Sequence, residues 1–280
     1  MGLADDLRAT AHKMQTPAKV LTFDIETRHA IYASFGPKVR GGWMGKGKQL
    51  IRSSTMFWAA KWYHESRVLS ESIAHEDVMF LKPEDTPGYA GMMESLRDLL
   101  DKADIVSTYN GDRFDIPRVR GEFKRLGLRQ PLPFASLDLI KTIRTMGFDY
   151  NSLQEAAEAV GLGGKVQHQG ESLWLDCLRG DEKAWRVMTK YGRRDVVLTE
   201  QVADAYRPEI KGHPNLNLWS FDAQGNPVEC CVNCGHTEFV PVAKGKVTPQ
   251  TRYGTMECAA CHAPMRRSYV KARTTIRSAR

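Results

Sequence analysis

The chain lacks the long apolar runs of a membrane protein. Its 280 residues are 42% hydrophobic, a normal share for a folded soluble protein, and no window approaches the ~20 apolar residues of a membrane-spanning helix. The N-terminus has no basic segment followed by an apolar one, so we expect no secretory signal peptide. Asp6 replaces the Ser or Thr of a myristoylation signal. Internal repeats are also missing. These absences favour a soluble cytoplasmic protein.

Cysteine is nearly absent from the first 229 residues. Cys177 stands alone there, and we expect it to be a small core residue. The other five cysteines lie between 230 and 261. Without a secretory signal, clustered CxxC pairs favour a metal site over disulfides.

Acidic residues are missing from one stretch and scarce in another. Residues 34–56 hold no Asp or Glu, and their basic residues are Lys38, Arg40, Lys46, Lys48 and Arg52. This composition predicts a long basic loop, in which Trp43 could stack on a nucleobase or pack on the protein body. Residues 228–280 carry nine Lys or Arg and three Glu, on a chain of net charge +7. A basic segment favours a polyanionic partner, of which nucleic acid is the commonest, although a solvated basic tail has the same composition.

Hydrophobic periodicity predicts an alternation of strands and helices. We expect strands at 20–26, 56–63, 67–74 and 105–109, a strand or strand-to-helix turn at 137–139, and helices at 87–102, from 117 to 126, at 153–160 and at 182–202. Two early strands are close enough in sequence to pair as a hairpin. The pattern therefore predicts an α/β fold with a mixed sheet flanked by helices. Turn-forming residues gather in 208–227, which we interpret as a linker.

The most informative stretch is Phe23-Asp24-Ile25-Glu26-Thr27, at the end of an apolar strand signal. Residues i and i+2 of a strand point to the same side, so Asp24 and Glu26 share a face. Carboxylates beside an apolar core need a partner, and a divalent cation satisfies two at once. The alternative is an exposed pair on an edge strand.

A third acid follows the strand predicted at 105–109. Open α/β sheets place ligands at that edge, where Asp115 lies between two apolar neighbours. Asp112, beside Gly111, is expected to be an exposed turn residue. This position makes Asp115 the better candidate for a metal ligand.

A fourth acid lies in the last long helix. Tyr191 and Asp195 are four residues apart and therefore share one helical face, although such a pair alone could be an ordinary surface. Acids from three elements can converge on two cations ~3.5–4 Å apart, which stabilise the attacking and leaving oxygens of a phosphoryl displacement. A phenol beside them can orient the attacking water without being ionised.

Three motifs in this order resemble those of a known enzyme family. The segments Phe23-Asp24-Ile25-Glu26-Thr27, Tyr109-Asn110-x-x-x-Phe114-Asp115 and Tyr191-x-x-x-Asp195 are similar to the exonuclease motifs of the DEDDy branch of the DnaQ-like, ribonuclease H-like 3′–5′ exonucleases. The likeness is nearest to proofreading domains of family B DNA polymerases and to free-standing relatives, and it covers roughly residues 19–207. Leu137-Asp138-Leu139 looks like the strand between the family's motifs. The sister DEDDh branch would have His where Lys190 stands.

The resemblance implies a role for each motif residue. Asp24, Glu26 and Asp195 would bind one Mg²⁺ or Mn²⁺ ion, and Asp24 with Asp115, directly or through water, would bind a second. Tyr191 would position the water. Thr27 and Asn110 match positions that contact the terminal nucleotide, although Asn110 could be only a turn residue. Phe114 is a further candidate contact that could equally be a packing residue.

Two CxxC pairs lie 23 residues apart near the C-terminus. Their cysteines are Cys231, Cys234, Cys258 and Cys261. Two such pairs complete a tetrahedral four-thiolate zinc site that has no open position for catalysis. Strand-like segments between them predict a zinc ribbon, which could hardly fold without its metal. Gly235 fits the turn after the first pair and His262 replaces it after the second, while Cys230 is out of register and expected to be spare. Nucleic-acid binding is the favoured use, and a stability or protein-docking module is the alternative.

Together these features predict the domain order. We expect a leader at 1–18, a ribonuclease H-like exonuclease domain at 19–207, a linker at 208–227 and a zinc ribbon with a basic tail at 228–280. The resemblance implies that the protein hydrolyses single-stranded or 3′-end DNA by a two-metal mechanism and releases 5′-mononucleotides.

Other functions remain open at this point. The motif acids would serve a 3′–5′ exoribonuclease equally well, because discrimination of the 2′-OH lies in pocket shape. A non-catalytic nucleic-acid-binding scaffold is a third candidate, against which the intact carboxylates argue. The size and domain pairing look similar to nucleases carried by bacteriophages, which implies DNA replication or repair in a bacterial or phage-infected cell, with a replication or recombination protein as a second candidate partner.

Overall fold

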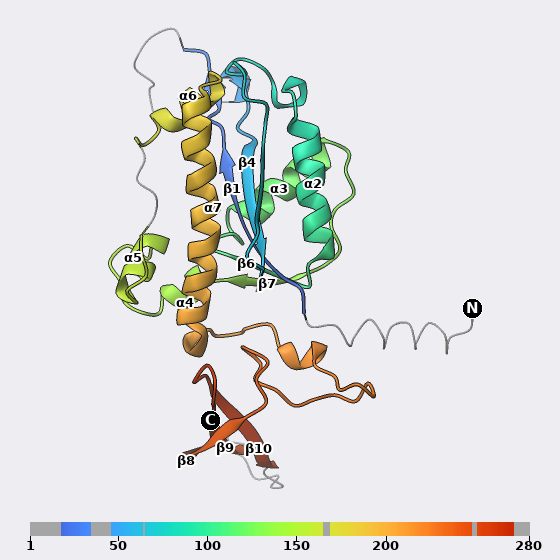
Figure 1. Ribbon diagram of the computed structural model, residues 1–280, viewed down its shortest axis with the longest axis vertical. Coiled ribbons are helices and arrows are strands. Elements are labelled where there is room, and N and C mark those ends of the chain that lie inside the picture. The colour runs from blue at the N-terminus through green and yellow to red at the C-terminus, as the bar shows by residue number, and fades with distance from the viewer. Residues whose placement is uncertain (1–17, 35–45, 64, 165–168, 248–250, 272–280) are drawn as a thin grey trace, which may run out of the picture. The chain divides into compact units, whose positions relative to one another are not determined.

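The computed structural model describes residues 18–34, 46–63, 65–164, 169–247 and 251–271 (Figure 1). Lys19–Asp204 form one compact unit, and the chain from Ala205 belongs to a second. The predicted leader, apart from Ala18, lies outside the described residues, as does Trp43 of the predicted basic loop. None of the helices in the described ranges is long and apolar enough to cross a bilayer.

A five-stranded sheet forms the centre of the first unit, in the order β5-β4-β1-β6-β7. The strands are β1 (Val20–Thr27), β4 (Thr55–Trp62), β5 (Val68–Ser72), β6 (Ile105–Thr108) and β7 (Ala135–Asp138). Strand β4 runs antiparallel to β1 and β5, whereas β6 and β7 run parallel to β1. The sheet is therefore mixed, which confirms the predicted fold class.

Helices cover both faces of the sheet (Figure 1). They are α2 (Tyr89–Lys102), α3 (Asp115–Arg125), α4 (Ile140–Ile143), α5 (Leu153–Ala159), α6 (Ser172–Leu178) and α7 (Glu182–Ala205). On the α2 side, the indole of Trp58 donates from Nε1 to Met92 O at 2.9 Å. On the other face, Lys61 of β4 pairs with Glu200 of α7. Strand β4 is therefore buried on both faces, and its face toward α7 also carries a charged group, Lys61.

The alternation along β1 decides which residues reach the site. Phe23 and Ile25 are buried in the main hydrophobic core, and Asp24 and Glu26 point to the opposite face as half-buried residues. Glu26 lies opposite Phe57 of β4. The register with β4 shifts between Glu26 and Thr27, so the two acids occupy the last regular positions of the strand.

The described part of the predicted basic loop contains regular structure. A 3-10 turn spans Lys46–Lys48, and β3 (Gln49–Ile51) pairs with β2 (Ile31–Tyr32). Arg52 lies in the connection between β3 and β4, and its guanidinium pairs with Glu84 and Glu122. The ion pair with Glu122 ties the connection between β3 and β4 to α3.

The chain from Ala205 is built around a three-stranded antiparallel sheet in the order β10-β9-β8. Its strands are β8 (Phe239–Val247), β9 (Thr251–Cys258) and β10 (Pro264–Lys271). The segment predicted as a linker contains two 3-10 turns, Arg207–Glu209, which begins just before it, and Leu216–Trp219. Asn217 Oδ1 accepts the N–H of Cys230 at 2.6 Å, so these turns pack against the cysteine-bearing segment.

Candidate active site

Asp115 lies beside β1 because β6 ends early. The parallel pairing of β1 with β6 stops at Thr22 and Ser107. Further along β1, the N–H of Ile25 donates to Asp115 Oδ1 at 3.1 Å. The carboxyl of Asp115, at the first position of α3, therefore meets β1 between the two acids of that strand. Burial raises the pKa of Asp115 to about 6, although the hydrogen bond from Ile25 lowers it; the negative charge of the nearby Asp138 adds a smaller upward shift.

Tyr191 and Asp195 are brought to the same end of β1 by α7. Both side chains are buried. The Tyr191 hydroxyl donates to Asp195, and burial raises the pKa of the phenol well above its ordinary value. The carboxylates of Asp195, Glu26 and Asp24 raise it further, in that order. Three acids from two elements therefore lie within electrostatic reach of one phenol, which stays protonated at neutral pH.

A pocket of about 280 Å³ opens beside these groups, and we call it the Glu26 pocket. Its lining residues are Glu26, Thr27, His29, Phe114, Glu171 and Trp174. The structure thus places Thr27 and Phe114, both predicted substrate contacts, on one hollow with a predicted metal ligand. Phe114 is 38% exposed, so it can meet a ligand.

Trp174 is a site residue that sequence reasoning missed. Its indole Nε1 donates to Glu26 Oε2 at 3.1 Å, and its ring meets that of Tyr191 edge-on, with centroids 6.2 Å apart. Helix α6, which carries Trp174, was not predicted either. No motif marks this segment, so only the tertiary contact with β1 could have identified the residue.

Asn110 does not line the Glu26 pocket. It has a positive φ of 65°, and its N–H donates to Asp138 Oδ1 at 2.7 Å. Asp112, expected to be exposed, is instead half-buried and bonded to Ser136 and Lys141. Asp138 and Asp112 thus tie the turn after β6 to β7 and α4, which fixes the start of α3 and the position of Asp115.

The donor chemistry of the four acids suits hard cations, because Mg²⁺ and Mn²⁺ favour carboxylate oxygens. Within the described ranges, however, the cysteines alone form a group whose ligand atoms all lie within 4.8 Å of one another. No three of the carboxylates meet that spacing. This holds also for Asp24, Glu26 and Asp195, the three acids that the resemblance assigns to one ion.

The four cysteines of the second unit form a compact cluster. Sγ of Cys231 lies 3.7 Å from that of Cys261, and Sγ of Cys234 lies 3.5 Å from that of Cys258. A tetrahedral zinc site with Zn–S bonds of 2.3 Å requires sulfur separations of about 3.8 Å. The thiols therefore stand where a zinc ion would hold them. Cys230 is outside the cluster, 3.0 Å from Ser220 Oγ.

Both CxxC turns have the same backbone geometry. The N–H of Gly235 donates to Cys231 O at 2.8 Å, and that of His262 donates to Cys258 O at 3.0 Å. Gly235 has a φ of 76° and His262 a φ of 58°, so His262 takes the left-handed conformation that glycine adopts freely. The ring of His262 is held by Glu257, with Nδ1 and Oε1 2.7 Å apart.

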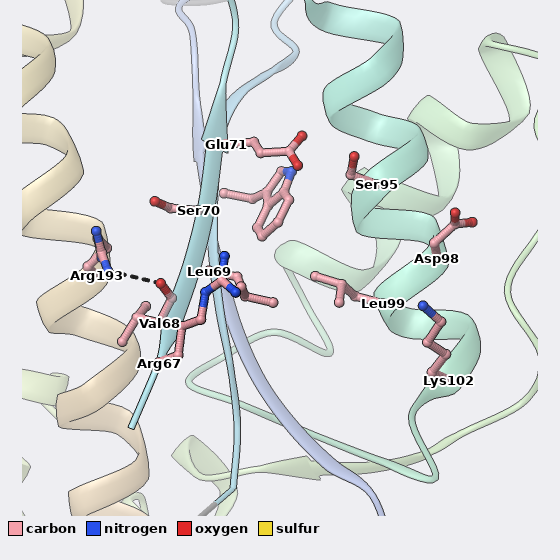
Figure 2. A pocket seen from close by; sticks show the side chains of 11 residues that line it. Arg67, Val68, Leu69, Ser70, Glu71, Ser95, Asp98, Leu99, Lys102 and Arg193 are labelled. Atoms are coloured by element: carbon pink, nitrogen blue, oxygen red, sulfur yellow. Dashed lines mark hydrogen bonds between the residues drawn. The ribbon is translucent and has the colours of Figure 1, made fainter. Parts of the chain in front are cut away.

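A larger pocket, of about 520 Å³, lies between β5 and α2 (Figure 2). Its cationic residues are Arg67, Lys102 and Arg193, and it also holds Glu71 and Asp98. None of the predicted catalytic residues lines it. Size alone therefore does not identify the candidate site, which is defined by the convergence of the acids.

Two comparisons with known proteins found a likeness, one to a family model and one to solved structures. Residues 71–207 match the family model of the RNase_H superfamily, just under half of the chain. No curated protein matches the sequence. Among solved structures, the family B DNA polymerase from the hyperthermophilic archaeon Pyrobaculum calidifontis is similar, with 17% identity and a TM-score of 0.47 over 69% of this chain. The chain spans 26% of that polymerase's length. The predicted fold class, ribonuclease H-like α/β with a small antiparallel sheet bearing four clustered cysteines, is confirmed.

Proposed function

We propose that the protein is a metal-dependent 3′–5′ exonuclease that hydrolyses DNA and releases 5′-mononucleotides. One observation carries the proposal: acids of β1, α3 and α7 converge around the end of β1, beside a protonated phenol and an open pocket. The match to the RNase_H superfamily over 71–207, which includes Asp115 and Asp195, supports a nuclease. The direction of digestion and the choice of DNA rest on the resemblance of the three motifs.

Asp24, Glu26, Asp115 and Asp195 would hold two Mg²⁺ or Mn²⁺ ions. When bound, the ions would stabilise the charge that develops on the phosphate and on the attacking and leaving oxygens. The N–H of Ile25 holds one oxygen of Asp115. Trp174 orients Glu26 in the same way. These contacts hold the acids in position before substrate arrives.

Tyr191 would orient the attacking water. Because burial and three carboxylates keep its hydroxyl protonated, it acts through hydrogen bonds and does not remove the proton itself. The terminal nucleotide would occupy the Glu26 pocket, in contact with Thr27 and Phe114. Asn110 lies in a turn and would contact the nucleotide only from outside this pocket.

The four-cysteine unit would hold one structural zinc ion and serve nucleic-acid binding. The described residue Arg266, stacked 4.9 Å from the Tyr253 ring centroid, is one cation available for that contact. A closed shell of four thiolates gives this ion no catalytic position.

The experiment that tests the proposal uses single strands of DNA and RNA labelled at either end, with and without Mg²⁺ or Mn²⁺. Stepwise release of 3′-terminal mononucleotides from DNA, lost in Asp24→Ala, is the expected result. Preferential digestion of RNA would favour the exoribonuclease. Binding of both strands without any product would leave the non-catalytic scaffold as the function.

A further inference from the structure

A second pocket adjoins the Glu26 pocket along α3, and we call it the α3 pocket. Its volume is about 380 Å³, and its charged lining residues are Arg113, Arg118, Arg125 and Glu122. Phe114 lines both pockets, so the two hollows are neighbours on the surface of the protein. The α3 pocket is therefore the continuation of the candidate active site along the protein surface.

The positive charge of the α3 pocket is not cancelled by its acid. Glu122 Oε1 accepts from Arg52 Nη1 at 2.7 Å, and its other oxygen accepts the Tyr89 hydroxyl. The nearby Glu84 is also bound by Arg52, at 2.9 Å. Arg52, which does not line the pocket, therefore pairs with both carboxylates. The three arginines that do line the pocket give it a positive charge.

Arg118 is held in place before any ligand binds. Its Nη1 donates to Ser53 Oγ at 2.9 Å, and its guanidinium carbon lies 5.1 Å from the centroid of the Phe114 ring. A stacked, hydrogen-bonded guanidinium loses little side-chain entropy when it meets an anion, and its planar fork matches the geometry of a phosphate.

We propose that the α3 pocket binds the phosphodiester backbone of the strand directly 5′ of the nucleotide in the Glu26 pocket. When the 3′ end of a DNA strand reaches the acids, the rest of that DNA extends away from the site toward its 5′ end. The α3 pocket lies next to the Glu26 pocket and can receive it. Guanidinium groups beside an aromatic ring are the combination that binds single strands without reading their sequence. The inference rests on the proposed function, because it takes the Glu26 pocket as the place of the terminal nucleotide.

The test compares Arg113→Gln/Arg125→Gln with the control Lys102→Gln/Lys124→Gln. The control also removes two positive charges, but from residues outside the α3 pocket. Lys102 lines the pocket of Figure 2, and Lys124 lies on α3 without lining the α3 pocket. Two substrates are used: a 12-nucleotide single strand of DNA, and the p-nitrophenyl ester of thymidine 5′-monophosphate, which has no upstream backbone. Thermal unfolding checks that each variant is folded.

The arginine variant should raise KM for the 12-mer about tenfold at physiological salt, with a smaller effect on the ester. Its plot of log kcat/KM against log salt should be less steep by about 1.4, since each lost contact to a single strand removes about 0.7. The control should behave like the wild type. An unchanged KM and salt slope would overturn the assignment. An equal rise in KM in the control variant would also overturn it, because net charge would then explain the effect. So would an equal rise in KM for the ester, because the acids themselves would then be disturbed.

Failure of the proposed function gives a separate result. If the wild-type protein cleaves neither substrate with Mg²⁺ or Mn²⁺, the exonuclease is rejected. Fluorescence anisotropy of the labelled 12-mer then tests the α3 pocket alone. Weaker binding by the arginine variant than by the control supports the pocket, and equal binding overturns it.

Discussion

Gly192 lies so close to Phe57 that a β-carbon built on it would stand 2.4 Å from the phenyl ring. The ring belongs to the β4 residue opposite Glu26. The missing side chain of Gly192 therefore lets α7 approach the sheet where Tyr191 and Asp195 meet the acids of β1.

Gly192→Ala should displace α7 from β4. We expect a loss of about 1–3 kcal/mol in the free energy of unfolding, typical of overpacking, together with a fall in kcat as Asp195 moves. Gly91→Ala is the matched control, because Gly91 lies in α2 with nothing within 4 Å of its added β-carbon. Urea unfolding and initial rates measure both effects. A Gly192→Ala protein with wild-type rate would show that the close approach does not position the acids.

Asp115 makes stability depend on pH. Its carboxyl has a pKa of about 6 in the folded protein and 3.8 as its ordinary value. The folded state therefore binds the proton more tightly, so ionisation destabilises it. Without divalent ions, the free energy of unfolding should fall as pH rises from about 4 to about 6, by roughly 3 kcal/mol.

Asp115→Asn should remove this pH dependence, because the amide oxygen still accepts from Ile25. The variant should be more stable than the wild type at pH 7.5, equal to it at pH 4, and inactive. Chemical unfolding in EDTA across this range is the measurement. The same decline in Asp115→Asn would assign the effect to another group.

Tyr191→Phe should lower kcat by about 10²–10⁴ if the hydroxyl orients the attacking water. Because the pKa of Tyr191 is raised, the wild-type rate should show no loss near pH 10 from its ionisation. A pH–rate profile of both proteins is the measurement. A limb near pH 10 that disappears in the variant would indicate that the phenol ionises.

Trp174→Phe removes the N–H donor to Glu26 and keeps an aromatic ring in place. Loss of a partner that orients a metal ligand weakens metal affinity by about 10–100-fold. Calorimetric titration with Mn²⁺ measures this effect directly, and Trp219→Phe, in the second unit, serves as the control. If both variants bind Mn²⁺ as the wild type does, Trp174 only fills space.

The cysteine cluster should hold one zinc ion per chain. Cys258→Ser should lose the ion and unfold β8, β9 and β10, because the three strands have a small core centred on the cysteines. Cys230→Ser, outside the cluster, should keep it. Elemental analysis and circular dichroism distinguish the two variants. Retention of zinc by Cys258→Ser would place the ion elsewhere.

Local patterns were sufficient to predict most elements of the sheet and helices. Apolar alternation marked β1, and helical periodicity marked α2 and α7 within a few residues of their ends. Elements without a strong pattern were missed: α6 is seven residues long, and β3, within the segment interpreted as a loop, pairs with the two-residue strand β2 that precedes that segment. Short elements are held by tertiary contacts, which a single sequence does not show.

The sequence by itself determined the mixed α/β fold and, through i, i+2 and i, i+4 spacing, which acids share a face. It also determined the four-cysteine cluster, because CxxC turns present two thiols wherever they fold. Only the tertiary structure decided that Trp174 binds Glu26, that Gly192 admits α7 to the sheet, and that a pocket lined by arginines shares Phe114 with the Glu26 pocket. These contacts join residues far apart in the chain, and their geometry depends on how the helices pack against the sheet.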